Sequence, residues 1–150
     1  MHVSARCDYA LRALVALAAD GHPMTAEQLA RSQDLPVSYL EAILLDLRKA
    51  GIVASRRGPD AGYRFVRRPA ELTPADVMRA VEGPLADVRG LRPEATTYSG
   101  SAVPLSQLWV ALRAGIRGVL EGVTIEQLAS GHLPRHLAKL VADPDAWLPH

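Results

Sequence analysis

The sequence predicts a mainly α-helical chain with one small β-hairpin. Apolar residues recur at helical spacing in several segments, and Ser or Thr residues stand where helix N-caps are expected. Only residues 52–67 combine two short strand-like stretches with a glycine-containing turn between them. The length of 150 residues suits one small domain with an appended element.

Three helices are predicted before residue 50. Ser4 can cap the first helix, which Gly21 ends, and Thr25 with Gln28 has the spacing of a capping box that opens the second. Pro36 is expected at an early position of the third helix. The apolar faces comprise Ala10, Leu11, Leu14, Leu17 and Ala18 in the first helix, Ala26, Leu29 and Ala30 in the second, and Leu40, Ile43, Leu44 and Leu47 in the third.

A β-hairpin is predicted directly after these helices. Residues 52–57 and 63–67 are its strands, and residues 58–62 form the loop. Two helices joined by a short turn and followed by a hairpin make a winged helix-turn-helix. Thr73 and Pro74 then begin a further helix, which Gly83 ends. Residues 1–83 are therefore predicted to form a DNA-binding domain.

The remaining chain is predicted to contain a loop, a long helix, a short helix and a tail. Residues 84–103 are rich in Pro, Gly, Thr and Ser and read as a loop, whereas a helix starts at Pro104. Its apolar stripe comprises Leu105, Leu108, Trp109, Leu112, Ile116, Val119 and Leu120. A second copy of the chain is the simplest partner for that stripe, so we expect residues 104–130 to contain a dimerisation helix and a short following helix. Residues 131–150 are expected to be an irregular tail.

Positive charge is concentrated in residues 48–68. This segment holds seven of the seventeen Lys and Arg residues and one acidic residue, Asp60, which leaves ten basic against fifteen acidic residues elsewhere. A +6 segment on a −5 body is typical of a protein that binds a polyanion. The alternative is a charged hairpin edge that prevents aggregation. Seven basic residues exceed that need, which favours phosphate binding.

The third helix is the predicted reading helix. Its polar face presents Ser38, Tyr39 and Glu41, and Glu41 can accept a hydrogen bond from cytosine N4. The alternative is an ordinary solvated face. The other predicted DNA-binding residues are Arg48, Lys49, Arg56, Arg57, Gly58, Gly62, Tyr63 and Arg64. The two glycines give the turn its backbone freedom, and the arginines suit a narrow minor groove.

Several other classes of protein are not indicated. Cys7 is the single cysteine, so no disulfide framework or multi-thiolate site is expected, and no metal site or catalytic arrangement is apparent. Cys7 is a candidate redox switch, because a helix N-terminus can lower a thiol pKa; the alternative is a small packing residue. No apolar run approaches the ~20 residues that cross a bilayer. We therefore expect a cytoplasmic protein that is not an enzyme.

The order of motifs resembles the family of winged-helix repressors that includes IscR, NsrR and CymR. The matching segments are Tyr9 to Leu14, Ser38 to Glu41, Leu47 to Gly51, Arg57 to Arg64 and Val77 to Pro84. The resemblance covers roughly residues 1–125. It implies a homodimer joined through the long helix, a partly palindromic DNA operator and control of transcription.

The resemblance also bears on cofactors. Relatives that hold an iron-sulfur cluster carry three cysteines in the loop before the long helix, whereas residues 84–103 contain none, so a conventional cluster is not expected. The resemblance does not decide which signal controls the protein. The alternatives are oxidation of Cys7, a small-molecule effector that binds between the long helix and the first helix, and no ligand at all. A second hypothesis is a winged-helix adapter that docks a protein partner through the long helix.

Overall fold

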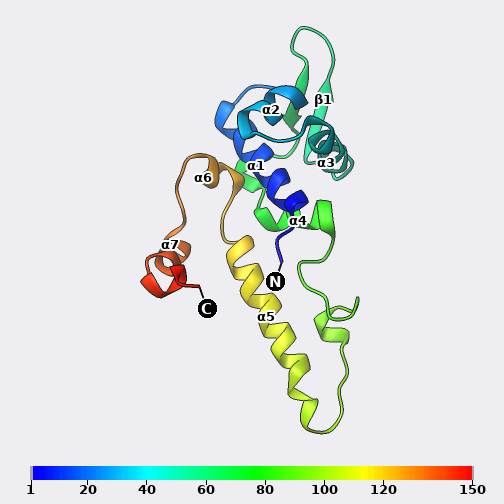
Figure 1. Cartoon of the computed structure of the whole chain (residues 1–150), viewed down its shortest axis with the longest axis vertical. Coiled ribbons are helices and arrows are strands. Elements are labelled where there is room, and N and C mark those ends of the chain that lie inside the picture. The colour runs from blue at the N-terminus through cyan, green and yellow to red at the C-terminus, as the bar shows by residue number, and fades with distance from the viewer. Residues whose placement is uncertain (1, 150) are drawn as a thin grey trace.

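The computed structural model, which describes residues 2–149, consists of a winged head from which one long helix extends (Figure 1). The helices are α1 (Ala5–Asp20), α2 (Ala26–Gln33), α3 (Val37–Lys49), α4 (Pro74–Glu82), α5 (Pro104–Leu120), α6 (Ile125–Ala129) and α7 (Arg135–Val141). Strands β1 (Val53–Arg56) and β2 (Gly62–Phe65) pair as an antiparallel hairpin. Short 3-10 turns occupy Pro69–Glu71, Pro93–Ala95, Gly100–Ala102 and Pro144–Trp147. The predicted fold class is confirmed.

Side-chain caps begin four of the seven helices of residues 2–149, including those predicted at Ser4, Thr25 and Thr73. The Ser4 hydroxyl accepts a hydrogen bond from the backbone N–H of Cys7 at 3.1 Å, and Gly21 ends α1 in the left-handed conformation. Capping boxes begin α2 at Thr25, α4 at Thr73 and α6 at Thr124. Pro36 differs from expectation, because its extended backbone places it before the first residue of α3.

The core of the head lies where α1, α2, α3 and α4 meet. The residues of the predicted apolar face of α3 are completely buried, and so are Leu14 of α1 and Leu29 of α2. Burial of each such leucine contributes about 1.5–3 kcal/mol. Ile125 joins the same core, and its N–H donates to the carbonyl of Leu72 at 2.8 Å. The short helix α6 therefore returns to pack on α1.

The hairpin loop is shifted by one residue from the prediction, because it comprises residues 57–61 rather than 58–62. Gly62, which was expected in the loop, belongs to β2 and pairs with Arg56. Next to it, Tyr63 forms an isolated bridge with Met24 at the start of the helix-turn-helix. This bridge joins the wing, defined here as residues 53–65, to the head.

Residues 84–103 run back along α5 (Figure 1). The turn at Pro93–Ala95 packs against α5, and Pro93 and Thr96 are buried. The indole N–H of Trp109 donates to the Tyr98 hydroxyl at 2.9 Å. The predicted loop is thus an ordered strap along the long helix.

The long helix α5 has no buried residue in the single chain. Four members of its predicted stripe are widely exposed: Leu105 at 37%, Leu108 at 53%, Leu112 at 50% and Val119 at 42%. Trp109, Ile116 and Leu120 are partly buried, and the first two line a cavity together with residues of the strap and α4. An apolar face therefore lies open along α5.

The tail is more regular than predicted. Residues 135–141 form α7, so the expectation of an irregular segment throughout residues 131–150 is wrong. Pro134 occupies the N-cap position of this helix and separates His132 from His136.

Candidate nucleic-acid interface

The polar face of α3 points away from the core. Ser38, Tyr39 and Glu41 are exposed within the first turns of the helix, while Leu40 between them is completely buried. The first residues of a reading helix are the ones that reach base edges. Their hydroxyl and carboxylate groups can donate to and accept from bases or phosphates.

Helix α1 supports the start of α3. The Tyr9 ring meets the Tyr39 ring edge-on, with centroids 5.6 Å apart and planes at 89°. The Arg12 guanidinium lies 5.6 Å from the Tyr9 centroid and donates to the carbonyl of Gln33. Tyr9 and Arg12 were absent from the predicted site. The signals for them were their place in the family-like segment from Tyr9 to Leu14 and their three-residue spacing, which puts them on one helix face.

Basic residues at the end of α3 differ in their contacts. Arg48 donates to the Ser55 hydroxyl of β1 at 3.2 Å, so its side chain spans the gap between α3 and the wing. The Lys49 ammonium lies 3.9 Å from Asp46, which also pairs with Arg6. Arg48 therefore retains a positive charge that no carboxylate of residues 2–149 pairs with, whereas Asp46 partly balances the charge of Lys49.

Three arginines of the wing face solvent. Arg56, Arg57 and Arg64 are exposed, and none makes an ion pair with any residue between 2 and 149. Gly58 adopts a φ of +103° at the turn between them. Unpaired guanidinium groups on a narrow hairpin can bind phosphates or enter a minor groove.

Gly62 and Tyr63 occupy a different environment from these arginines. Gly62 is buried against the backbone of Met24, and Tyr63 packs partly against the head core. Gly62 is therefore buried away from any DNA contact, whereas Tyr63 is only half-buried and its contact with DNA stays a prediction. Both residues shape the wing and join it to the head.

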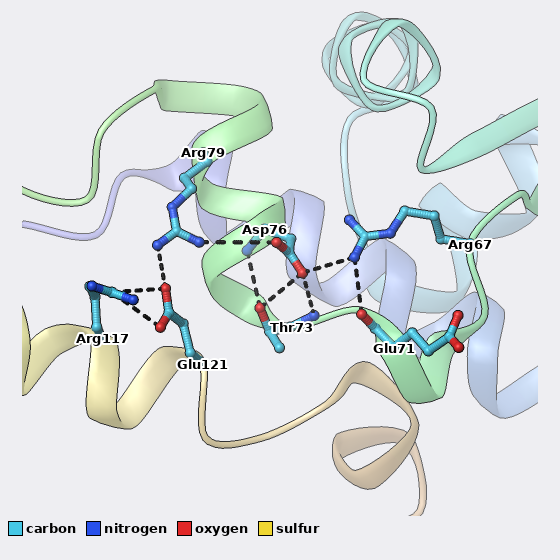
Figure 2. A network of polar contacts seen from close by, with 7 residues as sticks. All are labelled: Arg67, Glu71, Thr73, Asp76, Arg79, Arg117 and Glu121. Atoms are coloured by element: carbon cyan, nitrogen blue, oxygen red, sulfur yellow. Dashed lines mark hydrogen bonds and ion pairs between the residues drawn. The ribbon is translucent and has the colours of Figure 1, made fainter.

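Arg67 and Arg68 turn away from the wing tip. Arg67 donates to the Glu71 carbonyl at 3.0 Å and to Asp76 at 3.3 Å, as Figure 2 shows. Arg68 pairs with the carboxylate of Glu71. The sequence count of seven basic residues therefore overstates the free charge. The unopposed cations are Arg48, Arg56, Arg57 and Arg64.

Cys7 lies inside the head. Its side chain is completely buried, and burial raises the pKa of the thiol to about 11, with smaller contributions from Glu82 and Asp8. This direction contradicts the expectation that the helix terminus lowers the thiol pKa. Burial disfavours the reactive thiolate that a redox switch requires.

The comparisons with known proteins agree with this geometry. Residues 3–131 match the family described as Rrf2, iron-dependent transcriptional regulator. The chain belongs to the Rrf2 family. It is therefore a DNA-binding transcriptional regulator, which confirms the predicted resemblance and favours this function over a protein-docking adapter.

Individual Rrf2 relatives resemble the chain over most of its length. It is 42% identical over 145 residues to a Mycobacterium tuberculosis protein assigned as an HTH-type transcriptional regulator, covering 95% of this chain and 90% of that one. The structure of CymR, described as the global cysteine regulator of B. subtilis, superposes with a TM-score of 0.74 at 30% identity, covering 89% and 99%. The structure of IscR from T. potens superposes with a TM-score of 0.69 at 26% identity, and the match covers 92% of this chain and 96% of that one.

The iron dependence in the family description was tested against the donor atoms of this chain. A cluster held by several thiolates of one chain does not fit, because Cys7 is the only cysteine and is buried. Residues 2–149 also contain no group of three or more His, Cys, Asp or Glu side chains placed to hold a metal ion. Among those same residues, no helix is both long and apolar enough to span a bilayer.

Proposed function

We propose that this Rrf2 protein is a homodimeric repressor that reads DNA with α3 and grips the backbone with its wing. The observation that carries the proposal is that α3, with its exposed polar face, packs beside the hairpin (Figure 1), which carries three exposed arginines without ion pairs. Ser38, Tyr39 and Glu41 would contact base edges. Arg48, Arg56, Arg57 and Arg64 would neutralise phosphates and set the register on the duplex.

A second copy of the chain would cover the open face of α5. Leu105, Leu108, Leu112 and Val119 lie along this face. An exposed apolar stripe of this length favours burial against another helix. A two-fold pair of chains would present two reading heads to a partly palindromic operator.

We propose that the protein regulates without a conventional iron-sulfur cluster. The support comes from the chain's single buried thiol and from the cysteine-free strap. Iron content and visible absorption of anaerobically purified protein test this point. Stoichiometric iron with a charge-transfer absorption band would contradict it.

DNA binding is tested by fluorescence anisotropy on a duplex from upstream of the protein's own gene, at several salt concentrations. The log-log slope of affinity against salt should be about −0.9 per phosphate contacted. Replacing both Arg56 and Arg57 with alanine should weaken every duplex alike, by roughly ten- to a hundredfold, and make the slope shallower by about 1–2.

A matched control removes the same charge elsewhere. Arg135 and Lys139 are exposed on α7, and their double alanine variant should leave affinity nearly unchanged. Salt-independent binding, or equal losses in the two double variants, would contradict the proposed interface. A single stoichiometric protein partner with no DNA affinity would support the adapter hypothesis.

A further inference from the structure

Four arginines from three segments surround one surface cavity. Arg79 of α4, Arg92 of the strap, and Arg113 and Arg117 of α5 line a cavity of about 440 Å³, whose floor includes residues 83–86. Glu94 is the only acidic residue in this lining. A concave surface lined by one sign of charge focuses the electrostatic potential and attracts the opposite charge.

Nearby carboxylates balance only part of this charge. Arg113 pairs with Glu94, while Glu121 accepts hydrogen bonds from Arg79 and from Arg117, the latter at 3.1 Å. Arg92 has no ion-pair partner within residues 2–149. Asp76 lies near Arg79 as well but also pairs with Arg67, so the whole network holds five cations and three carboxylates, a local excess of two positive charges. A purely structural ion-pair network would not require this excess.

The cavity is separate from the proposed dimerisation face. At about 100° per residue, Arg117 lies about 180° around α5 from Leu108 and about 160° from Val119. A second chain that packs on the Leu108 and Val119 side therefore leaves the arginines accessible. Helix α5 and the strap, which carry most of the lining, extend from the head on the side opposite the wing (Figure 1).

The charge suits a small doubly charged oxyanion. Guanidinium groups bind carboxylates and phosphates through paired, charge-assisted hydrogen bonds. We propose that Arg79, Arg92, Arg113 and Arg117 form a binding site for a small dianion, such as a phosphate monoester or a dicarboxylate. Arg92 makes the primary contact, since it has no ion-pair partner within residues 2–149, whereas Arg113 is already engaged by Glu94 and both Arg79 and Arg117 by Glu121.

The site connects to the base of the wing. Arg79 lies 4.0 Å from Asp76, and Asp76 accepts a hydrogen bond from Arg67 at 3.3 Å (Figure 2). A bound dianion competes with Glu121 for Arg79 and Arg117. Ligand binding therefore alters a continuous set of polar contacts that runs from the end of α5 to Arg67, two residues beyond the wing.

Titration calorimetry on the full chain without DNA tests the site independently of the proposed repressor function. Inorganic phosphate and succinate are the probes, with sodium chloride at matched ionic strength as the reference. Saturable binding of either dianion at one site per chain is expected. A preference for phosphate or for succinate identifies which oxyanion group the site prefers.

Variants then locate the site. Arg92→Gln, which removes no ion pair, and Arg113→Gln should each weaken binding at least about tenfold, because each loses a charge-assisted hydrogen bond. Glu121→Gln should tighten binding severalfold, because it removes the competing carboxylate. Arg135→Gln on α7 is the matched control and should bind like the native chain.

The proposal has clear contrary outcomes. Absence of saturable binding of both probes to a natively folded chain would overturn it, and so would binding that survives the Arg92→Gln and Arg113→Gln changes together. Circular dichroism melting of each variant separates loss of the site from loss of the fold. Arg113→Lys, which keeps the charge opposite Glu94 but loses the planar fork, should retain the fold and still bind more weakly.

Discussion

Met24 and Tyr63 exchange two backbone hydrogen bonds across the junction between the head and the wing. The Met24 N–H donates to the Tyr63 carbonyl at 3.1 Å, and the Tyr63 N–H donates to the Met24 carbonyl at 2.7 Å. The strand β2 is thereby paired on both sides at this residue, with β1 and with Met24. The wing consequently takes its direction from the loop between α1 and α2.

This pairing requires glycine at position 62. Gly62 has a φ of +137°, and a Cβ atom there would lie 2.6 Å from the Met24 carbonyl carbon. Gly62→Ala should destabilise the protein by roughly 2–4 kcal/mol, because strain and a backbone clash add. Chemical denaturation measures this loss. Gly58 also has a positive φ but has open space around it, so Gly58→Ala should lower stability less. Equal losses of stability in the two variants would contradict the proposed clash with Met24.

Glu41 should control base preference more than affinity. Its exposed carboxylate on α3 repels phosphate but can accept from a cytosine amino group. Glu41→Ala should hold or raise affinity for random duplexes and reduce discrimination at one base pair by about 1–3 kcal/mol. Selection from randomised duplexes measures the change, and Glu126→Ala on α6 serves as the charge control. If base preference is unchanged in the Glu41→Ala variant, Glu41 does not take part in base recognition.

The open face of α5 should control the oligomeric state. Replacing Leu108 and Val119 with glutamate should yield monomers at micromolar concentration, whereas the native chain should elute as two copies of its 16.1 kDa mass. Size-exclusion chromatography with light scattering reports the mass. Val110→Glu is the matched control, since Val110 is exposed about 160–180° away from both residues on the same helix. A native monomer would contradict the dimer.

Cys7 should react slowly in the native protein. Its pKa, raised from 9.0 to about 11, means that the folded state holds the thiol proton more tightly than the unfolded state. The stability from the neutral thiol is fully present below pH 9 and is lost as the pH rises toward 11. Iodoacetamide labelling at pH 8 should be much slower in native than in denatured protein. A peroxide response of DNA binding that Cys7→Ser abolishes would contradict this expectation.

Glu121 should make folding stability sensitive to acid. Hydrogen bonds from Arg117 first and Arg79 second lower the pKa of this carboxyl from 4.5 to about 2. The stability that it contributes is present above pH 4.5 and is lost as the pH falls toward 2. Glu121→Gln should flatten the dependence of unfolding free energy on pH in this window. If the unfolding free energy of native and variant protein depends on pH in the same way, the ion pairs of Glu121 contribute nothing to stability.

Local signals made most of the helical head predictable. Caps at Ser4, Thr25 and Thr73 act within three residues, and the apolar stripe of α3 follows from helical spacing alone. Helix α7 was missed because the prolines of the tail were taken as evidence of irregular chain. Pro134 instead begins a helix that contains no further proline or glycine.

The parts that could not be predicted depend on contacts between distant residues. The approach of Gly62 to Met24 joins positions 38 residues apart in the sequence. The burial of Cys7 and the effect of Glu82 on its thiol depend on the packing of α4, which a helix-dipole argument ignores. A count of basic residues likewise could not tell Arg57, which is free, from Arg67, which Asp76 holds.

The hydrogen bond between Ile125 and Leu72 has a consequence for operator geometry. It anchors the chain just beyond the C-terminal end of α5 to the segment just before α4, so the long helix meets the head at a fixed angle. If two chains pair through α5, the separation of their reading helices is then a property of the folded chain. Such a protein binds only operators whose half-sites have the matching separation. Inserting five base pairs between the half-sites rotates one of them by about half a helical turn and should abolish simultaneous binding of both reading helices.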